Sequence, residues 1–433
     1  MQYLVLLLFV VMPVAAHACP DLTPYYPGDN PDWPTLEREM AGLMPQCLEN
    51  GEYFALFGAA QLNSGSIDAA SESLERALLL QPDHGGAQID YAEALYLQGQ
   101  LFSALEMNRQ LLARDDLPAD LQPLIRQRQR NWQGQTRQRG FQADLLAGYD
   151  DNLNGAPDPD TITLTLSGEP VLLELNPEYR PISGPYLNLR MAARYRQLAP
   201  QHQHNWLVEA RGRISEDTES DLVQLGGQYA FIRPGRRHSW QLNTGVNHLA
   251  FGGNPLFTAV DARTRFQPRS GRTCRPYLGL AAQHQHFHHQ RNLNALESKA
   301  SAGLTCPFNN GMGSQLLSAE FSLLNNAALN NGRAGGSRDG WQVNADWQMT
   351  LSGGVLLTQL SHTELDDRDG YSPLLADGAE RWLTRSYALI QYRWPVSSRT
   401  DLLVNFYHQY QRSNIELFQS TDTSVELGFG FSF

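Results

Sequence analysis

The spacing of apolar residues changes once along the chain, from a helical period to a strand period. Between residues 51 and 117, apolar and small residues recur every three or four positions, which predicts amphipathic helices. From residue 141 onward, apolar and polar residues alternate: Leu187 and Leu189 fall on one face, and Asn188 and Arg190 fall on the other. Such alternation predicts strands that have one apolar and one polar face.

Fourteen alternating segments follow one another, with aromatic residues near many of their ends. They cover about 141–152, 185–198, 203–215, 221–233, 237–251, 257–267, 273–287, 293–306, 313–325, 338–350, 353–365, 381–394, 399–412 and 417–433. The connections between these segments alternate between two sets. Those of one set are short and rich in Pro, Gly or Ser, and those of the other set include long loops at 153–184, 326–337 and 366–380. These features are typical of an outer-membrane barrel, whose turns are short on the periplasmic side. We therefore predict a 14-stranded antiparallel transmembrane β-barrel.

The last strand carries a second signal for the outer membrane. Val425, Leu427, Phe429 and Phe431 share one face with Phe433, the last residue of the chain. This pattern resembles the C-terminal β-signal that the outer-membrane insertion machinery reads. That machinery is accordingly an expected partner.

The helical region repeats itself with a period of 34 residues. Gly65 and Gly99 are one period apart, and so are Ala70 and Ala104. Aromatic and small residues and Pro82 fall where a tetratricopeptide repeat has them, whereas Asn108 and Asp116 depart from the pattern. Two repeats are fewer than the roughly three that such arrays need, so we expect helices at about 33–47 and 119–132 to cap them. Arrays of this kind bind peptides or proteins, and we predict Asn63, Glu93 and Tyr96 as partner-binding residues. A generic helical hairpin is the alternative.

The N-terminus predicts export. Leu4 to Val14 form an apolar core, and Ala16-His17-Ala18 is an A-x-A cleavage pattern. We therefore predict a signal peptide over 1–18, a periplasmic tetratricopeptide-like helical domain over 19–138 and an outer-membrane β-barrel over 139–433. The formal net charge of −12 argues against nucleic acid as a partner.

Four cysteines form two pairs that are local in the sequence. An even count in an exported protein favours disulfides, here Cys19 with Cys47 and Cys274 with Cys306. Cys274 and Cys306 flank one hairpin, and residues directly opposed in it would have numbers that sum to 580, as these two do. Neighbours on one face of two strands lie close enough for a disulfide. Cys19 directly follows the cleavage pattern, so a lipid anchor on it is the alternative to ordinary cleavage.

The order of the segments resembles a known family. A signal peptide, a short tetratricopeptide domain and a 14-stranded barrel follow one another, and the barrel opens with Asp150-Asp151-Asn152-Leu153-Asn154-Gly155-Ala156-Pro157. This resembles the surface lipoprotein assembly modulator (Slam) family, whose barrels begin with a similar Asn-x-Asn-x-Ala-Pro segment. The resemblance implies an outer-membrane translocation factor. It would assist export or surface display of a secreted protein or lipoprotein that the periplasmic repeats recognise.

The polar faces of the strands suggest a second function. Arginines expected to point into the lumen are Arg190, Arg194, Arg196, Arg211, Arg213, Arg263, Arg265, Arg385 and Arg393. They outnumber the acidic residues expected there, which are Glu209, Asp261, Glu297, Glu320 and Asp346. A net cationic lumen would favour anionic solutes, so an exopolysaccharide or anionic-solute export channel is the alternative function. The other possibility is that opposite charges pair inside the barrel and make it rigid.

No motif in the sequence predicts catalysis or a cofactor. There is no G-x-S-x-G, and no C-x-x-C that would indicate a redox or zinc site. His284, His286 and His288 share a face at spacing two but lack carboxylate or Cys partners. We therefore expect no enzyme, no metal and no cofactor.

Overall fold

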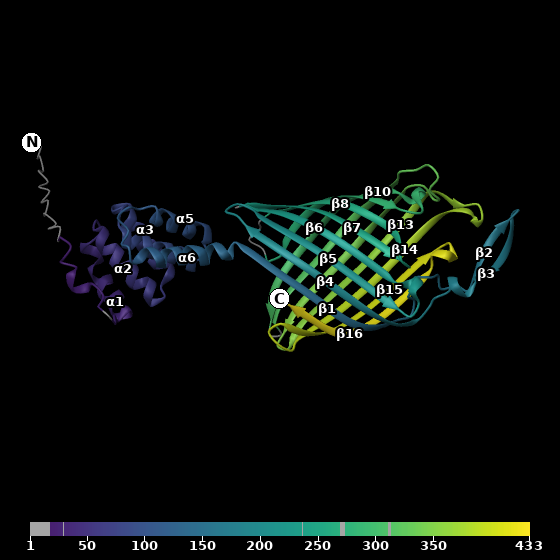
Figure 1. Ribbon diagram of the computed structural model, residues 1–433. Helices are drawn as coiled ribbons and strands as arrows, with labels where there is room; N and C mark the ends of the chain where they lie inside the picture. The colour runs from purple at the N-terminus through teal and green to yellow at the C-terminus, as the bar shows by residue number, and fades with distance from the viewer. Residues whose placement is uncertain (1–17, 29, 236, 269–272, 311–312) are drawn as a thin grey trace, which may run out of the picture. The chain divides into compact units, whose positions relative to one another are not determined.

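The computed structural model describes residues 18–28, 30–235, 237–268, 273–310 and 313–433. The chain divides into two compact units, Met1–Thr136 and Arg137–Phe433 (Figure 1). In the part of the chain that the structure describes, the first unit is built from helices and the second mainly from strands. Nearly all of the predicted signal peptide lies outside the described residues.

Six α-helices lie in the described residues of the first unit. They are α1 (Trp33–Leu43), α2 (Gly51–Ser64), α3 (Ile67–Leu80), α4 (Gly85–Leu97), α5 (Leu101–Leu112) and α6 (Leu121–Gln135). Asp32 and Asn50 cap α1 and α2, because each side chain accepts a hydrogen bond from a backbone N–H of the first turn. Gly65 and Gly99 follow α2 and α4 with φ of +88° and +76°, a conformation that favours glycine. The α2–α3 and α4–α5 hairpins therefore repeat with the period of 34 residues.

Small residues set the close packing within each hairpin. A Cβ atom on Gly58 of α2 would lie 2.6 Å from the side chain of Leu74 on α3. Ala70 on α3 and Ala104 on α5, one period apart, are fully buried. Tyr53, Leu74 and their neighbours form the core of the first hairpin. Helices α1 and α6 lie at the ends, as predicted for capping helices.

Asn108 departs from the repeat because it attaches the last helix. It stands one period after Leu74 and is fully buried on α5. Its amide group donates to the carbonyl of Ile125 at 3.1 Å and to Gln129 at 2.7 Å, and its Oδ1 accepts from Arg128 at 2.8 Å. A leucine could form none of these bonds with α6. Asn108 therefore makes polar contacts with α6 in place of the apolar contact that a leucine makes within the hairpin.

The second unit is a closed antiparallel barrel of fourteen strands with one additional hairpin. The strands are β1 (Arg137–Asp150), β4 (Gly184–Leu198), β5 (Gln203–Ser215), β6 (Leu222–Pro234), β7 (His238–Phe251), β8 (Asn254–Pro268), β9 (Arg275–Phe287), β10 (Ala295–Asn310), β11 (Gly313–Ala328), β12 (Arg338–Leu351), β13 (Gly354–Ser372), β14 (Leu375–Pro395), β15 (Thr400–Ser413) and β16 (Ser420–Ser432). The hairpin consists of β2 (Thr161–Leu166) and β3 (Glu169–Glu174). Each barrel strand pairs with its neighbours in the chain, and β1 closes the ring by pairing with both β4 and β16. The predicted fold class and strand count are confirmed.

Two of the predicted long loops are wrong in part. The segment 153–184 contains the β2–β3 hairpin, and most of 366–380 belongs to the long strands β13 and β14. Asp367 explains the second difference, because it pairs with Arg338 at 2.8 Å and with Arg381 at 3.1 Å. These ion pairs hold a run of charged residues in the sheet where its composition indicates a loop.

The barrel exposes its apolar face to the outside. Leu187, Leu189 and Met191 are exposed, whereas Asn188 is fully buried on the inner face of the same strand. Exposed aromatic residues lie toward both ends: Trp206, Trp240 and Trp394 near the short turns, and Tyr149, Trp382 and Tyr410 near the opposite end. This is the surface of an outer-membrane barrel with its two aromatic girdles. None of the helices in the described residues is long and apolar enough to cross a membrane.

Both cysteine pairs form disulfides. Cys19 joins Cys47 and Cys274 joins Cys306, with Cα atoms 4.6 Å and 4.1 Å apart. Strands β9 and β10 pair in the predicted register, since Thr305 lies opposite Arg275. The first disulfide ties the start of the helical unit to its core, where Leu22 is buried.

Candidate functional site

A cavity of about 680 Å³ inside the barrel lies against β1, β4 to β7 and β14 to β16. Its charged lining is balanced. The basic residues are Arg190, Arg194, Arg211, Arg213 and Arg393, and the acidic residues are Asp144, Asp150, Glu209, Asp422 and Glu426. Four of these acids, Asp144, Asp150, Asp422 and Glu426, were not among the residues expected in the lumen. They have even numbers on β1 and β16, whose odd-numbered apolar residues face outward, so the alternation itself contained the signal.

A second cavity of about 500 Å³ lies against β7 to β14. Four carboxylates line it, from Asp261, Glu297, Glu320 and Asp346, together with the cations of Arg263, Arg265 and Lys299. Arg263 pairs with Asp261 at 3.1 Å, and Lys299 pairs with Glu297 at 3.2 Å. A third cavity of about 240 Å³ includes Arg385, whose guanidinium donates to Gln411. Eight of the nine arginines expected in the lumen therefore line these cavities, and Arg196 is not among the lining residues. Carboxylates balance the cations of the linings, which agrees with the expectation of paired charges and not with that of a net cationic lumen.

Glu426 on β16 is the centre of a buried network in the larger cavity. Its carboxylate accepts hydrogen bonds from the Tyr186 hydroxyl at 3.0 Å, from Asn188 at 2.6 Å and from Asn405 at 2.8 Å. Arg190 completes the network with an ion pair. Tyr186, Asn188 and Arg190 lie on β4 and Asn405 lies on β15, so these bonds cross the seam where the last strand meets the first. The network stabilises closure of the ring.

Gly148 makes room for one of these bonds. It lies on β1 opposite both Tyr186 and Glu426. A Cβ atom at Gly148 would lie 2.6 Å from the ring of Tyr186. The ring therefore lies flat across the glycine, and its hydroxyl reaches the carboxylate on the far strand.

The same arrangement recurs on the opposite wall. Gly303 on β10 lies opposite both Tyr277 on β9 and Glu320 on β11. A Cβ atom there would lie 2.4 Å from the ring of Tyr277, whose hydroxyl donates to Glu320 at 3.0 Å. The guanidinium of Arg265 lies 3.4 Å from the centre of this ring. Side chains thus cross-link three adjacent strands at two places on the inner wall.

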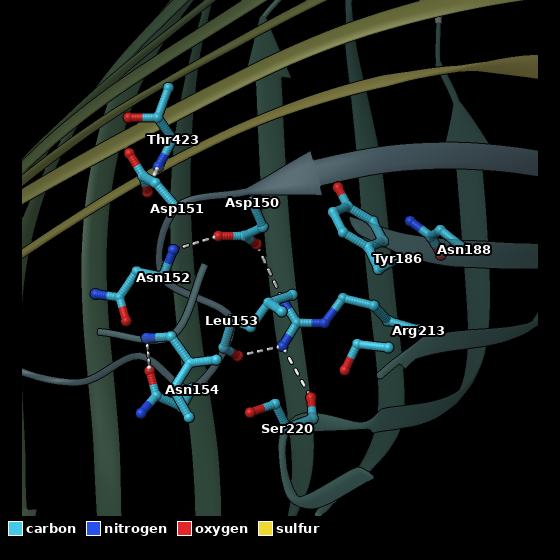
Figure 2. Close-up of polar contacts among 12 residues, drawn as sticks. Asp150, Asp151, Asn152, Leu153, Asn154, Tyr186, Asn188, Arg213, Ser220 and Thr423 are labelled. Atoms are coloured by element: carbon cyan, nitrogen blue, oxygen red, sulfur yellow. Dashed lines mark hydrogen bonds and ion pairs between the residues drawn. The ribbon is translucent and has the colours of Figure 1, made fainter. Parts of the chain in front are cut away.

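The segment after β1, on which the family resemblance rests, is folded against the inner wall (Figure 2). Arg213 of β5 donates to Asp150 at 3.2 Å and to the carbonyls of Leu153 at 2.5 Å and Ser220 at 3.0 Å. Asn152 is buried, and its side chain bonds both the N–H and the carbonyl of Ala156 at 2.9 Å. The two asparagines of the motif therefore shape the loop, because Asn154 likewise bonds the N–H of Ile182 and the carbonyl of Arg180.

Carboxylates of β1, of the residue after it and of β16 form a close acidic group among the described residues. Ligand atoms of Asp150, Asp151 and Asp422 lie within 4.8 Å of one another. Asp150 is engaged by Arg213 and by the N–H of Asn152, and Asp151 accepts from the N–H of Thr423. Protein groups therefore already bind the carboxylates of Asp150 and Asp151, and no bound ion is needed to explain the position of either one.

A cluster of arginines lies near the end of the barrel that carries the long loops. Asp367 of β13 is buried between Arg338 of β12 and Arg381 of β14. Arg381 lies between the rings of Tyr371 and Phe418, at 4.6 Å and 4.3 Å from their centres. Phe418 belongs to the connection between β15 and β16, so the cluster ties that loop to the β13–β14 hairpin.

The predicted partner-binding residues lie at different depths in the helical unit. Asn63 is exposed and donates only to the carbonyl of Ala59 one turn earlier. Tyr96 stacks on Trp132 of α6 at 4.8 Å, and Glu93 pairs with Arg128 of α6 at 3.6 Å. Both of these side chains are therefore partly occupied by packing against α6. Their binding role stays a prediction.

Buried and half-buried charges lie along the first helix of each hairpin. Burial raises the pKa of Asp90 on α4 to about 6, although Arg128 opposes this shift. On α2, hydrogen bonds from Tyr26 and His84 lower the pKa of Glu52. His84 lies 2.9 Å from Glu52 and also caps α4, so the two hairpins are linked through it.

Comparison with known proteins gives likenesses to solved structures alone. No protein-family model matches the chain, and no curated protein matches it. An anion-selective porin from Comamonas acidovorans aligns over 69% of this chain and 99% of its own, with 10% identity and a TM-score of 0.36. OprB of Pseudomonas putida aligns over 71% of this chain and 96% of its own, with 8% identity and a TM-score of 0.36. SycD, a type III secretion chaperone of Yersinia enterocolitica solved with a peptide of the translocator YopD, aligns over 24% of this chain and 81% of its own. Its identity is 17% and its TM-score 0.22. Likeness of fold at this identity does not imply likeness of function.

Fold and lumen together define the class of protein. The chain is an outer-membrane-type β-barrel of fourteen strands that carries an N-terminal unit of six helices.

Proposed function

We propose that the chain is an outer-membrane translocation factor that assists export or surface display of a protein partner. The helical unit recognises the partner, which is a secreted protein or a lipoprotein. The observation that carries the proposal is that two helical hairpins, repeating every 34 residues and capped at both ends, continue directly into the first barrel strand. Helical repeats of this kind offer extended binding surfaces for polypeptide.

The ends of the barrel support a periplasmic location of the helical unit. Strand β1 begins and β16 ends at the same end of the barrel, since Gln142 lies opposite Ser432. The connections at that end are short, such as those between β4 and β5 and between β12 and β13. Short turns are periplasmic in outer-membrane barrels. The helical unit then meets its partner before export, and the insertion machinery reads the C-terminal strand.

The alternative function, an anionic-solute channel, loses the observation that favoured it. The expected excess of arginine is not found in the cavity linings, where carboxylates balance the cations. Networks such as the one around Glu426 hold these groups in place. A rigid lumen whose charges are paired gives little support to selection of anions. It agrees better with a barrel that acts together with a bound partner.

The experiment that tests the proposal is deletion of residues 20–135, followed by a survey of surface-exposed proteins. We expect a small set of proteins to be missing from the cell surface of the deletion strain, while the barrel still inserts into the outer membrane. Asn63→Arg is the matched point variant, because Asn63 is exposed and makes only a local bond, and Glu72→Arg on the same hairpin is its control. An unchanged surface proteome in the deletion strain would overturn the proposal.

A further inference from the structure

The β2–β3 hairpin presents an open strand edge. Among the described residues β3 pairs with β2 alone, so the last strand of the sheet has a free side. All six residues of β3 are exposed. In Figure 1 the hairpin projects beyond the ends of the barrel strands. Alternate residues of such a strand direct their N–H and C=O groups away from the sheet. On β3 these are Leu172 and Glu174 with both groups and Pro170 with its C=O alone, since proline has no N–H. Natural proteins usually block such edges.

The hairpin is attached to the barrel along β2, which leaves the edge of β3 in a defined position. The Leu166-Ser167-Gly168-Glu169 turn has φ of +53° at Ser167 and +83° at Gly168, which suits a two-residue hairpin turn. Thr163 of β2 donates its N–H to Glu416 at 2.6 Å. Thr165 donates to the carbonyl of Leu374 at 2.9 Å. These bonds attach β2 to the barrel loops and leave β3 as the outer strand.

Exposed apolar side chains occupy the middle of the free strand. Val171, Leu172 and Leu173 are 42%, 74% and 45% exposed. Leu166 of β2 and Leu374 of the neighbouring turn are also exposed and extend the patch. A patch of aliphatic side chains that nothing covers marks a surface that binds a partner.

Charge defines the two ends of the same strand. Glu169 begins β3 and Glu174 ends it, and between residues 158 and 180 there are five acidic residues but one basic residue, Arg180. Arg180 pairs with Glu174 at 2.7 Å. A partner that matches this edge has an apolar centre and basic residues at its ends.

We propose that the free edge of β3 binds an extended polypeptide segment by strand addition, and that this segment has an aliphatic centre flanked by Lys or Arg. The backbone groups decide between a polypeptide and a lipid. Acyl chains can cover Val171 and Leu173, but they offer no hydrogen bonds to the N–H and C=O groups of an open edge. A polypeptide strand satisfies both the backbone and the side chains. An exported chain would be one such segment, and only this identification rests on the proposed function.

The test uses the full-length protein in detergent and a fluorescent nine-residue peptide, with alternating Val and Thr in the centre and Arg at both ends. We expect saturable binding by fluorescence anisotropy. Exchanging the terminal Arg for Glu, or Leu173→Lys in the protein, should weaken binding about tenfold or more. Leu329→Lys is the matched control, because Leu329 is 48% exposed in another loop and should leave binding unchanged.

Backbone methylation of the peptide separates strand addition from contact with side chains alone. N-methylation of one alternate set of residues should abolish binding, and N-methylation of the other set should have little effect, because only one set faces β3. Equal loss with both sets, or no binding by any peptide, would overturn the proposal. A dimer of the full-length protein that Leu173→Lys converts to a monomer would also overturn the proposal, because it would assign the edge of β3 to a second copy of the chain. Lipid-nanodisc binding that Leu173→Lys removes would assign it to the membrane. These measurements do not involve residues 20–135, so they fail or succeed independently of the export test.

Discussion

Gly148 on β1 and Gly303 on β10 lie on opposite walls of the barrel and have the same surroundings. Seven strand-to-strand steps separate them in a ring of fourteen strands. Each glycine lies between a tyrosine on one neighbouring strand and a glutamate on the other, and each tyrosine hydroxyl donates across it at 3.0 Å. Two cross-links of the same kind therefore strengthen the inner wall at sites half a circumference apart.

Gly148→Ala is expected to destabilise the barrel by about 1–3 kcal/mol, the usual range for overpacking. The added Cβ would lie 2.6 Å from the ring of Tyr186 and 2.9 Å from the carbonyl oxygen of Val425, so a methyl group cannot fit without moving the ring or the strand. Gly140→Ala is the control, since a Cβ atom at that position on β1 meets nothing within 4 Å. The temperature at which the folded band disappears in a gel-shift assay measures the difference. Equal temperatures for the two variants would contradict the packing described here.

Glu426→Gln should destabilise the barrel by about 3 kcal/mol, because it leaves the Arg190 guanidinium in the wall without its carboxylate. Glu320→Gln is the matched variant, because Glu320 accepts from Tyr277 and Ser322 and forms no ion pair with an arginine among the residues that the structure describes. We expect it to cost about 1 kcal/mol. Arg190→Gln combined with Glu426→Gln should recover part of the lost stability. Denaturant titration in detergent would show this, and similar losses for the two single variants would argue against the ion pair.

The sequence predicts the strands well because the outer face of a barrel wall contacts lipid and the inner face contacts a polar lumen. Leu187 and Asn188 must point to opposite sides, so the period of two is visible in the residues themselves. The pairing of Cys274 with Cys306 follows from the same register. Predictions that rest on local pattern and neighbour pairing are therefore the ones that the structure confirms.

Long-range contacts explain what the sequence could not predict. Asp367 lies in a run of charged residues, and only its pairing with Arg338 and Arg381 shows why that run is strand. Asn108 breaks the helical repeat because its partners lie on α6. The acids at the lumen were missed for a different reason, since Glu426 lies between the outward-facing Val425 and Leu427, and apolar residues dominate the pattern of the last strand. The β2–β3 hairpin was also missed, although Ser167-Gly168 between alternating Thr and aliphatic residues is a turn signal.

Asp90→Asn should stabilise the helical unit at neutral pH. Burial raises the pKa of Asp90 to about 6 in the folded state, above its ordinary value of about 4, so the folded state favours the protonated carboxyl. The stability of the native unit therefore rises as the pH falls from 7 through 6 and gains nothing more below about 4. The amide removes the penalty at pH 7, worth roughly 3 kcal/mol for a shift of about two pKa units, and the advantage should vanish near pH 4. Hydrogen exchange of α4 in the full chain would measure this, with the exposed Asp115→Asn as control. A constant difference at all pH values would contradict the titration of Asp90.

Removing each disulfide should weaken only the unit that contains it. Cys19 and Cys47 are separated by 28 positions and Cys274 and Cys306 by 32, so the chain-entropy model gives each bond roughly 3–4 kcal/mol. The two units have separate cores, and distant sites act additively. Replacing Cys19 and Cys47 by Ser should therefore speed hydrogen exchange in α1 and α2, and leave the gel-shift temperature of the barrel unchanged. Replacing Cys274 and Cys306 should do the reverse. Peptide mapping without reductant should identify both bonds. A bond between Cys47 and Cys274 would contradict the division into separate units. A lipid on Cys19 would contradict the first disulfide.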